Sequence, residues 1–458
     1  MRYKLPFTNP IVTYDSCSAN ELLSLVNRHL VTNEHLVDSQ QELWLATYDH
    51  YVCVRPPQKI MPVSLDEVVQ SKRGSKKKQY RRALESLRVK PLTQRDANIK
   101  MFVKNERMTL TVPPKAPRAI QSRSPRYNLH FQQFTIAYSK LWYKNIPLDD
   151  RVCTKGMNQL EIASWIVTNW AKYSDPVADL YDHSFFDSKQ NSLAIFYQNK
   201  YVDSCFNDPE YNELYKQRIN NKCYTRNGIR YKVVATRLSG DGDTSDGNST
   251  LNDMMLCYVN RGLRHSRCLI GDDSIVIRER SDGHLVDRES LAAYGFATKH
   301  AIANSIADIE YCQCKPVHTQ GGWLMVRDPQ RVISRGTVCI DRSINTLDLY
   351  KRWCRGVGDC EVTCNRGVPV LQAFAKFMQR ATDSKAILDR EFEYHQLDAI
   401  LPEQITDTAR VSFYEAFGIT VSMQLHLEQM FDGLSWDVDL LRRELPSDPT
   451  CTYLISCL

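Results

Sequence analysis

The stretch Cys268–Ile277, CLIGDDSIVI, has the pattern that decides the fold. Two short apolar runs rich in β-branched residues flank Gly271-Asp272-Asp273-Ser274, which predicts a strand, a tight turn and a returning strand. The hairpin would present two adjacent carboxylates at its tip, where the glycine lets the backbone turn sharply. Asp and Gly also populate ordinary turns, so this pattern alone leaves both a structural turn and a metal-binding turn open.

Length and composition limit the class of protein. A chain of 458 residues with 43% hydrophobic residues predicts a folded protein of two or three subdomains. We expect a soluble, cytosolic chain, because there is no run of about 18 apolar residues and no signal-peptide pattern. The fifteen scattered cysteines indicate free thiols in a reducing compartment. Cys354, Cys360 and Cys364, with Cys312 and Cys314, lack the paired spacing typical of structural zinc.

Charge is divided unevenly along the chain. Ser71–His130 contains 17 Lys and Arg against three Asp and Glu, whereas Lys385–Leu458 contains five basic and 13 acidic residues. A basic block of this density is typical of a protein that binds a polyanion, because neutralising phosphates releases counterions. A solvated charged face or a localisation signal around Ser71–Lys78 would give the same composition.

Three segments before the middle of the chain have a readable pattern. From Gln79 the spacing of apolar residues predicts a helix, and Lys155–Trp170 predicts a second, amphipathic one. Between them, Pro113–Tyr127 contains four prolines, which predict an extended segment that presents Lys and Arg at intervals. Such a segment is suited to line a channel for triphosphates or a nucleic-acid backbone.

Two further stretches carry candidate chemistry. Val177–Asp187 predicts a strand that runs into a helix, with Asp182 and Asp187 on either side of the strand end. A carboxylate there and a pair on the hairpin tip can share two divalent cations, the arrangement that phosphoryl transfer uses, and Mg²⁺ suits oxygen ligands. Ser239–Asn248, SGDGDTSDGN, predicts a flexible loop followed by a helix whose N-terminus offers unpaired N–H groups to a nucleotide or template. A capped helix after a polar loop is the alternative.

The order of these motifs, DxxxxD, SGxxxTxxxN and GDD, resembles motifs A, B and C of viral RNA-dependent RNA polymerases. The surrounding stretches FVKNE, PRAIQSRSPRYN, LYDHSFFD, YGFATKH and IEYCQCKPV narrow the resemblance to the tombusvirus-like polymerases of positive-strand RNA viruses. The similarity extends from about Tyr80 to about Arg380. It implies template-directed RNA synthesis by two-metal-ion nucleotidyl transfer, with initiation that needs no primer.

The resemblance also implies roles for individual residues. Asp182, Asp272 and Asp273 would bind two Mg²⁺ ions, for which Mn²⁺ can substitute, and Lys299 would be a general acid on a mobile loop. The remaining assignments concern the nucleotide and the RNA. Ribose and nucleotide contacts would come from Asp187, Ser239, Gly240, Thr244 and Asn248, triphosphate contacts from Lys104, Arg107, Lys115 and Arg118, and RNA contacts from Arg123 and Arg126.

The implied fold is α+β, a right-hand polymerase with fingers, an antiparallel palm sheet with helices, and a mostly helical thumb. We expect an N-terminal segment at 1–78, fingers with the basic motif F at 79–172, palm at 173–205, a fingers insertion at 206–234, palm again at 235–318, and thumb with the C-terminal region at 319–458. Expected partners are RNA and ribonucleoside triphosphates, and also other viral replication proteins and host membranes reached through a partner. The expected location is the host cytoplasm, at membrane-associated replication complexes.

One position departs from the family pattern, because Asp243 stands where these polymerases commonly have Asn. The acidic side chain either is neutral for function or alters the contact of the loop with template, and we expect Asp243→Asn to leave nucleotide addition within about tenfold. Two other functions stay open: a catalytically impaired RNA-binding replication factor of the same fold, and another two-metal enzyme such as a reverse transcriptase or nuclease.

Overall fold

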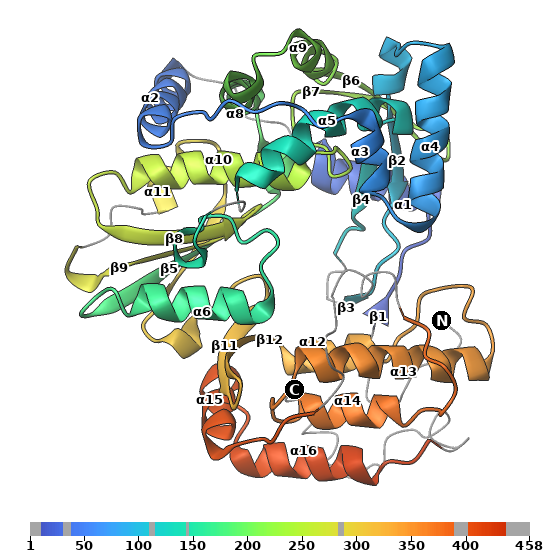
Figure 1. Ribbon diagram of the computed structural model, residues 1–458, viewed down its shortest axis with the longest axis vertical. Helices are drawn as coiled ribbons and strands as arrows, with labels where there is room; N and C mark the ends of the chain where they lie inside the picture. Colours follow the sequence, from blue (N-terminus) through green and yellow to red (C-terminus); the bar gives the residue numbers. More distant parts are fainter. Residues whose placement is uncertain are drawn as a thin grey trace.

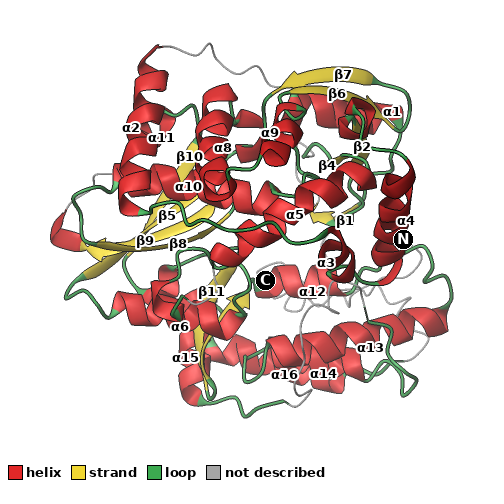
Figure 2. Ribbon diagram, turned by 45° about the horizontal axis from the view of Figure 1, so that its top comes forward, coloured by secondary structure: helices red, strands yellow, loops and turns green. Residues whose placement is uncertain are grey.

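The computed structural model describes residues 11–30, 38–109, 115–142, 146–282, 288–388 and 402–436. Helices and small sheets are mixed along the chain, and Figures 1 and 2 show their arrangement around a central antiparallel sheet. The expected α+β class is therefore confirmed.

The central sheet has the strand order β10-β5-β9-β8, and all three pairings are antiparallel. The predicted hairpin is present, because β8 and β9 pair directly and the Gly271-Asp272 turn joins them. The four strands are β5 (Pro176–His183), β8 (His265–Ile270), β9 (Asp273–Glu279) and β10 (Thr298–Ala303).

Both faces of this sheet are covered, which explains the short apolar runs on either side of the hairpin turn, Cys268–Ile270 and Ile275–Ile277. Leu269 and Val276 pack into one core, together with α2 (Asp38–Val54), α8 (Ser192–Phe206) and α10 (Thr244–Val259). Cys268, Ile275 and Ile277 alternate with them and pack into a second core with α6 (Gln159–Trp170) on the opposite face. Figure 1 shows α10 above the sheet and α6 below it.

A second sheet lies in the N-terminal half of the chain and has the strand order β4-β2-β6-β7. Its β2–β6 pairing is parallel, and the other two are antiparallel. The strands are β2 (Ile99–Val103), β4 (Ala119–Ser122), β6 (Asn220–Thr225) and β7 (Arg230–Val234). The helices of this region are α1 (Ser18–Ser24), α3 (Leu65–Gln70), α4 (Gly74–Val89), α5 (Pro125–Leu141) and α9 (Pro209–Lys216).

The C-terminal third is mostly helical and has a core of its own. The hairpin β11 (Cys314–Thr319) and β12 (Gly322–Arg327) connects it to the rest, since β12 also contacts α6. A Cβ on Gly358 would lie 2.5 Å from the backbone nitrogen of Gln379, so this glycine lets two helices pack closely. The helices are α12 (Pro329–Gly336), α13 (Leu347–Cys364), α14 (Leu371–Gln379), α15 (Asp407–Phe417) and α16 (Val421–Gly433).

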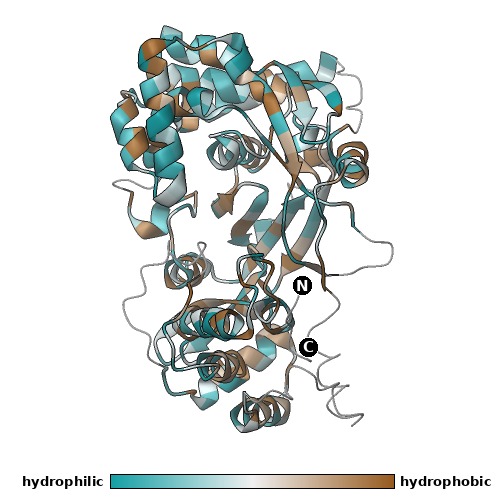
Figure 3. Ribbon diagram, turned by 90° about the vertical axis from the view of Figure 1, so that its right-hand side faces the viewer, coloured by the Kyte–Doolittle hydropathy of each residue, from teal (hydrophilic) through white to brown (hydrophobic). Residues whose placement is uncertain are grey.

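The predicted element boundaries differ in detail from the observed ones. The helix predicted from Gln79 begins earlier, at Gly74, so the lysines before Gln79 lie in its first turns, and the helix predicted from Lys155 begins later, at Gln159. In Figure 3 many helices carry hydrophilic and hydrophobic residues on different faces, as expected of amphipathic helices. The remaining elements are short: β1 (Ile11–Val12), β3 (Met108–Thr109), α7 (Phe186–Lys189), α11 (Arg288–Ala292), η1 (Leu25–His29), η2 (Gln94–Ala97), η3 (Leu148–Asp150), η4 (Arg280–Asp282) and η5 (Ile306–Asp308).

A buried network of charges connects the second sheet to the start of α10. Arg123 donates from Nε to Asp241 Oδ1 at 2.8 Å, and Arg218 donates to Asp241 Oδ2 at 3.1 Å and to Asp243 Oδ1 at 2.7 Å. Arg237 completes it with a 2.6 Å bond to Asp243 Oδ2. Burial alone would raise the pKa of Asp243, but Arg218 and Arg237 outweigh burial and hold that pKa well below its usual range.

Asp243→Asn is expected to destabilise the fold. The amide keeps the shape of the side chain but leaves Arg237, whose side chain is 1% exposed, without its charged partner. Breaking a buried ion pair from one side costs on the order of 3 kcal/mol. Thermal and denaturant unfolding measure the effect, with Asp175→Asn in the exposed Asp175–Arg280 pair as the matched control, expected to cost under about 1 kcal/mol. Equal stability of the two variants would contradict the importance of the network.

Candidate active site

The three predicted metal-binding aspartates come together at one end of the central sheet. Asp182 lies near the end of β5 and is the register partner of Asp273, the first residue of β9. Asp272 occupies the turn immediately before Asp273. The antiparallel pairing of two strands thus brings together carboxylates that are 90 or more positions apart in the sequence.

The helix α10 holds the turn that carries Asp272. Gly271 has a φ of +63°, which favours glycine at this position. Its N–H donates to Ser249 Oγ at 2.9 Å, and its carbonyl accepts from Asn252 Nδ2 at 3.1 Å. Both partners lie on α10, so the helix that follows the SG motif also fixes the position of the GDD turn.

Burial and the neighbouring carboxylates raise the pKa values of Asp272 and Asp273. Burial and the neighbouring Asp182 raise the pKa of Asp272, although Arg118 opposes that rise. Burial, Asp272 and Asp182 together raise the pKa of Asp273 to about 6. A cluster of carboxylates that destabilise one another in their charged form is an environment that a cation would stabilise.

The donor set fits a hard divalent cation. Asp182, Asp272 and Asp273 supply only carboxylate oxygens, the ligands that Mg²⁺ prefers. Across the described ranges, no group of three or more His, Cys, Asp or Glu side chains is arranged so that it could hold a metal ion. Asp182 is instead in contact with an ammonium group, which Lys299 supplies.

The position of Lys299 corrects one expectation. Lys299 lies on β10 as the register partner of Asp182, and not on a loop. Its Nζ is 3.0 Å from Asp182 Oδ2, and its side chain is 75% exposed. The strand places this lysine beside the aspartates by backbone pairing, so a proton donor at this position would be held in the sheet.

Asp187 and Asn248, the predicted ribose contacts, are bonded to each other. The chain turns after β5 through Phe185, whose φ is 54°, and Asp187 follows in the short helix α7. Asn248 Nδ2 donates to Asp187 Oδ1 at 2.6 Å. Burial raises the pKa of Asp187 to about 6, and Asn248 and Arg237 limit that rise. An amide and a carboxylate side by side offer a hydroxyl group both a donor and an acceptor.

The loop before α10 packs against β4. Ser239 Oγ donates to the carbonyl of Ala119 at 2.8 Å, and Thr244 Oγ1 donates to the carbonyl of Leu238 at 2.8 Å. A Cβ on Gly240 would lie 2.4 Å from the carbonyl oxygen of Gln121, so only glycine fits there. The structure therefore places Ser239 and Gly240 between the second sheet and α10, and Thr244 in the first turn of α10.

The predicted triphosphate contacts divide into three environments. Arg118 forms two bonds to Glu106, at 2.7 and 2.6 Å, and Lys104 lies 3.3 Å from the same carboxylate. Arg118 is 56% exposed and close enough to Asp272 for each to affect the pKa of the other. Arg107 instead donates to the carbonyl of Arg335 at 2.9 Å and lies over Trp353. Lys115 is exposed, and its carbonyl accepts from Tyr14.

The two predicted RNA contacts are tied into the protein. The Arg123 side chain is 1% exposed and bonds Asp241, Asn221 and the carbonyl of Ala97. Arg126 pairs with Asp96 at 3.1 Å and also donates to the carbonyls of Lys90 and Pro91. Arg123 is therefore part of the buried charge network, and because it also lines the cavity described next, its contact with RNA stays a prediction.

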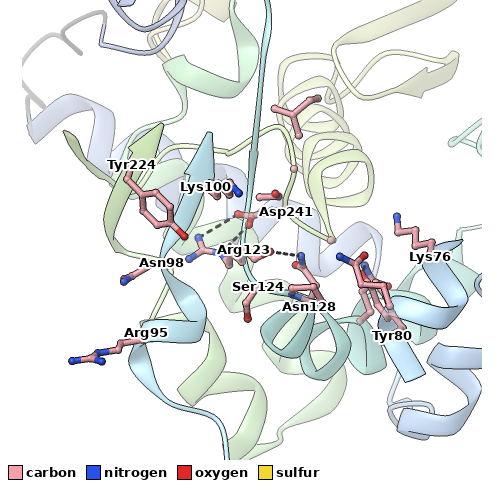
Figure 4. A pocket seen from close by; sticks show the side chains of 17 residues that line it. Lys76, Tyr80, Arg95, Asn98, Lys100, Arg123, Ser124, Asn128, Tyr224 and Asp241 are labelled. Atoms are coloured by element: carbon pink, nitrogen blue, oxygen red, sulfur yellow. Dashed lines mark hydrogen bonds and ion pairs between the residues drawn. The ribbon is translucent and has the colours of Figure 1, made fainter. Parts of the chain in front are cut away.

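A cavity of about 750 Å³ lies beside the SG loop (Figure 4). Gly240, Asp241 and Gly242 form part of its wall, and the Arg123–Asp241 ion pair lies at its back. Lys76, Arg95 and Lys100 also line it, with Tyr80 and Tyr224 as aromatic members. The cavity therefore combines positive charge with aromatic rings next to the loop, and we return to it below.

Some residues around the site have no role in the sequence-based prediction. Glu106 joins Lys104 to Arg118, although it was visible within the FVKNE motif. Gln190 and Arg237 bond each other behind Asn248. In the sequence, only their closeness to the motifs could have indicated a role, because Gln190 follows Asp187 by three residues and Arg237 precedes Ser239 by two. Within the described part of the chain, no helix is long and apolar enough to cross a membrane.

Comparison with known proteins agrees with this geometry. The family model described as viral RNA dependent RNA polymerase matches residues 7–439. The chain is 28% identical over 451 residues to the RNA-directed RNA polymerase of Groundnut rosette virus (strain MC1), covering 91% of this chain and 52% of the relative. It is 32% identical over 419 residues to the RNA-directed RNA polymerase of Tobacco necrosis virus (strain A). That match covers 86% of this chain and 56% of the relative.

A third relative is the RNA-directed RNA polymerase of Tomato bushy stunt virus (strain Cherry), 28% identical over 397 residues, with 81% of this chain and 47% of the relative covered. The chain thus spans about half the length of the curated relatives that it matches. The resemblance to tombusvirus-like polymerases is confirmed. The match over most of the chain shows that it belongs to the viral RNA-dependent RNA polymerase family.

Proposed function

We propose that this chain is the catalytic part of an RNA-directed RNA polymerase that copies a viral positive-strand RNA genome. One observation carries the proposal: three carboxylates meet at the end of β5 and the turn before β9, and a carboxylate–amide pair lies next to them. Metal-binding carboxylates and a donor–acceptor pair for a hydroxyl group are what addition of a ribonucleotide requires.

Asp182, Asp272 and Asp273 are the residues that would hold two Mg²⁺ ions, with Mn²⁺ as a substitute. When bound, such ions supply charge stabilisation for the attacking and leaving oxygens of nucleotidyl transfer. Arg118 adds positive charge beside Asp272, and Glu106 orients the planar guanidinium through two bonds. Lys104 shares that carboxylate, so a triphosphate would meet two cationic groups held together by one anion.

Asp187 and Asn248 would select a ribonucleotide through its 2′-OH. Ser239, Gly240 and Thr244 would support this pair by holding the loop against β4. Lys299 is the candidate general acid for the pyrophosphate leaving group, because its ammonium lies within 3.0 Å of Asp182. Lys115 and Arg107 would contact further phosphates of the nucleotide or the RNA.

The cavity in Figure 4 is the route that we propose for single-stranded template. Its lysines and arginines suit a phosphate backbone, and Tyr224, which is 44% exposed, offers a ring on which a base can stack. The adjacent SG loop leads from this cavity to Asp187 and Asn248. Arg126 lies at the edge of this region and would act on RNA only indirectly.

The three structural groups would correspond to the polymerase parts that the resemblance implies. The second sheet with α3, α4 and α5 would be fingers, and the central sheet with α6 and α10 would be palm. The mostly helical C-terminal third would be thumb. Part of the acidic C-terminal region, at 389–401 and 437–458, lies outside the described residues.

Initiation without a primer is the finer part of the proposal. It requires a place for the triphosphate of a first nucleotide beside the aspartates. A cavity of about 240 Å³ is lined by four arginines, Arg107, Arg327, Arg331 and Arg335, and by Cys312. Cys312 lies close enough to Asp273 to lower the pKa of that carboxyl, so this positive cavity adjoins the aspartate cluster. Cys312 and Gln313 both have positive φ, at 51° and 62°, in the turn before β11.

Location and further partners follow from the same proposal. We place the protein in the host cytoplasm, at membrane-associated replication complexes, where other viral replication proteins would provide the attachment. The runner-up function is a catalytically impaired RNA-binding replication factor of the same fold. Retention of all three aspartates favours an active enzyme, and the Asp187–Asn248 pair favours ribonucleotide addition over reverse transcription.

Replacing a central aspartate should abolish synthesis. Asp272→Ala or Asp182→Ala is expected to lower nucleotide incorporation at least about a hundredfold, ~2.7 kcal/mol of barrier, because a metal ligand is lost. Binding of single-stranded RNA should stay close to wild type in both variants. Incorporation of labelled ribonucleotide and filter binding measure the two properties, and Asp383→Ala, at an exposed aspartate, is the control. Substantial synthesis by either variant would contradict the metal assignment.

Arg118→Ala should act mainly on nucleotide affinity. We expect the KM for ribonucleoside triphosphate to rise about tenfold, ~1.4 kcal/mol, with a smaller change in kcat, because ground-state binding of phosphates is weakened. Steady-state kinetics on a primed template separate the two constants. Arg280→Ala is the matched control, since Arg280 is similarly exposed and also pairs with a carboxylate. A KM equal to that of the control would show that Arg118 contacts something else.

A further inference from the structure

Asn248 lies in the middle of a line of hydrogen bonds that continues away from the aspartates. Its Nδ2 donates to Asp187 Oδ1 at 2.6 Å, and its Oδ1 accepts from Gln190 Nε2 at 2.8 Å. Gln190 Oε1 in turn accepts from Arg237 Nε at 3.2 Å. The line therefore runs from Arg237 through two amides to the carboxylate that faces the ribose in the proposed function.

The direction of this line depends on Arg237. An amide can rotate by half a turn and exchange its donor and acceptor ends, so Gln190 and Asn248 have no preferred direction by themselves. A guanidinium only donates and a carboxylate only accepts. With Arg237 at one end and Asp187 at the other, every bond between them must point the same way, and Asn248 must present its NH₂ group to Asp187.

Arg237 is held in place from several sides. Its Nη1 donates to Asp243 Oδ2 at 2.6 Å, and its Nη2 donates to Gln198 Oε1 at 2.7 Å. A Cβ on Gly247 would lie 2.6 Å from Nη2, so the guanidinium packs directly on α10. The two residues before it, Ala235 and Thr236, have φ of 53° and 61°. Such strain in a non-glycine segment is maintained where the surrounding structure demands it.

Neither Gln190 nor Arg237 is placed to touch a nucleotide. Gln190 is 0% exposed and Arg237 is 2% exposed. Asp187, by contrast, is partly exposed, and in the described part of the chain its Oδ2 accepts no hydrogen bond. One carboxylate oxygen of Asp187 can thus accept from a ligand hydroxyl, and the NH₂ group of Asn248, a residue that is 6% exposed, carries a second hydrogen.

We propose that Gln190 and Arg237 are positioning residues for sugar selection, which fix the amide of Asn248 so that Asp187 and Asn248 together recognise a 2′-OH. Asp243 contributes by neutralising Arg237, which gives a role to the acidic residue that stands where the family commonly has Asn. The inference rests on the proposed function, because it assumes that Asp187 and Asn248 meet the ribose.

Gln190→Met tests the inference, since methionine keeps the length of the side chain and removes both hydrogen bonds. The readout is the ratio of kcat/KM for a ribonucleotide to that for the matching 2′-deoxynucleotide, on the same primed RNA. We expect this ratio to fall about tenfold, ~1.4 kcal/mol, chiefly through slower use of the ribonucleotide. A purely structural role would lower both values together and leave the ratio unchanged.

Gln198→Met is the matched control, because Gln198 is also a buried glutamine that accepts from Arg237 but does not contact Asn248. The ratio of the two kcat/KM values for Gln198→Met should stay within about twofold of the wild-type ratio. Gln190→Glu is the second variant, and it keeps the acceptor for Arg237 but has no donor for Asn248. It should lose discrimination as Gln190→Met does, and it answers the question even if Gln190→Met fails to fold.

Three results would overturn the inference. The first is an unchanged ratio in folded Gln190→Glu, and the second is a fall of the ratio in Gln198→Met equal to that in the Gln190 variants. The third is an equal fall of kcat/KM for the ribonucleotide and the 2′-deoxynucleotide in every Gln190 variant. The melting temperature of each variant checks that it is folded. A wild-type protein that incorporates no ribonucleotide at all would instead overturn the proposed function, so the two failures are distinguishable.

Discussion

The antiparallel pairing of β5 with β9 is the constraint on which the site depends. It places Asp182 opposite Asp273 and leaves Asp272 in the adjoining turn, so that three like charges share one end of the sheet. Such a cluster is unfavourable in a bare protein, and burial together with repulsion from Asp272 and Asp182 raises the pKa of Asp273. Two covered faces and two bonds from α10 to Gly271 hold the arrangement against this repulsion.

A second set of charges has the opposite character, because each of its members is paired. Asp241 and Asp243 lie among Arg123, Arg218 and Arg237, and all five side chains are buried or nearly so. This network connects the second sheet to the start of α10, and α10 in turn holds the GDD turn and Asn248. The mutually repelling carboxylates of the site are thus positioned by paired charges behind them, which cost less to bury.

Much of this arrangement was predictable from local sequence. The GDD hairpin, the strand before Asp182 and the helix after the SG loop follow from apolar periodicity and turn residues, and the order of the motifs indicated the family. The burial of Arg123 could not be predicted, because its basic neighbours indicate RNA contact, whereas burial depends on Asp241, 118 residues away. Lys299 was wrong as a loop residue because only strand pairing places it opposite Asp182. Gln190 and Arg237 could not be predicted, since their role depends on contacts between distant segments.

Single-nucleotide addition to a primed RNA template tests the central claim most directly. Purified protein, Mg²⁺ and each of the four ribonucleoside triphosphates in turn would be supplied with templates that differ in one base. The account predicts that only the ribonucleotide complementary to that base is added, and that addition stops when the divalent ion is chelated. Addition that ignores the template base, or that continues without a divalent ion, would contradict the assignment of the aspartate cluster as the centre of template-directed RNA synthesis.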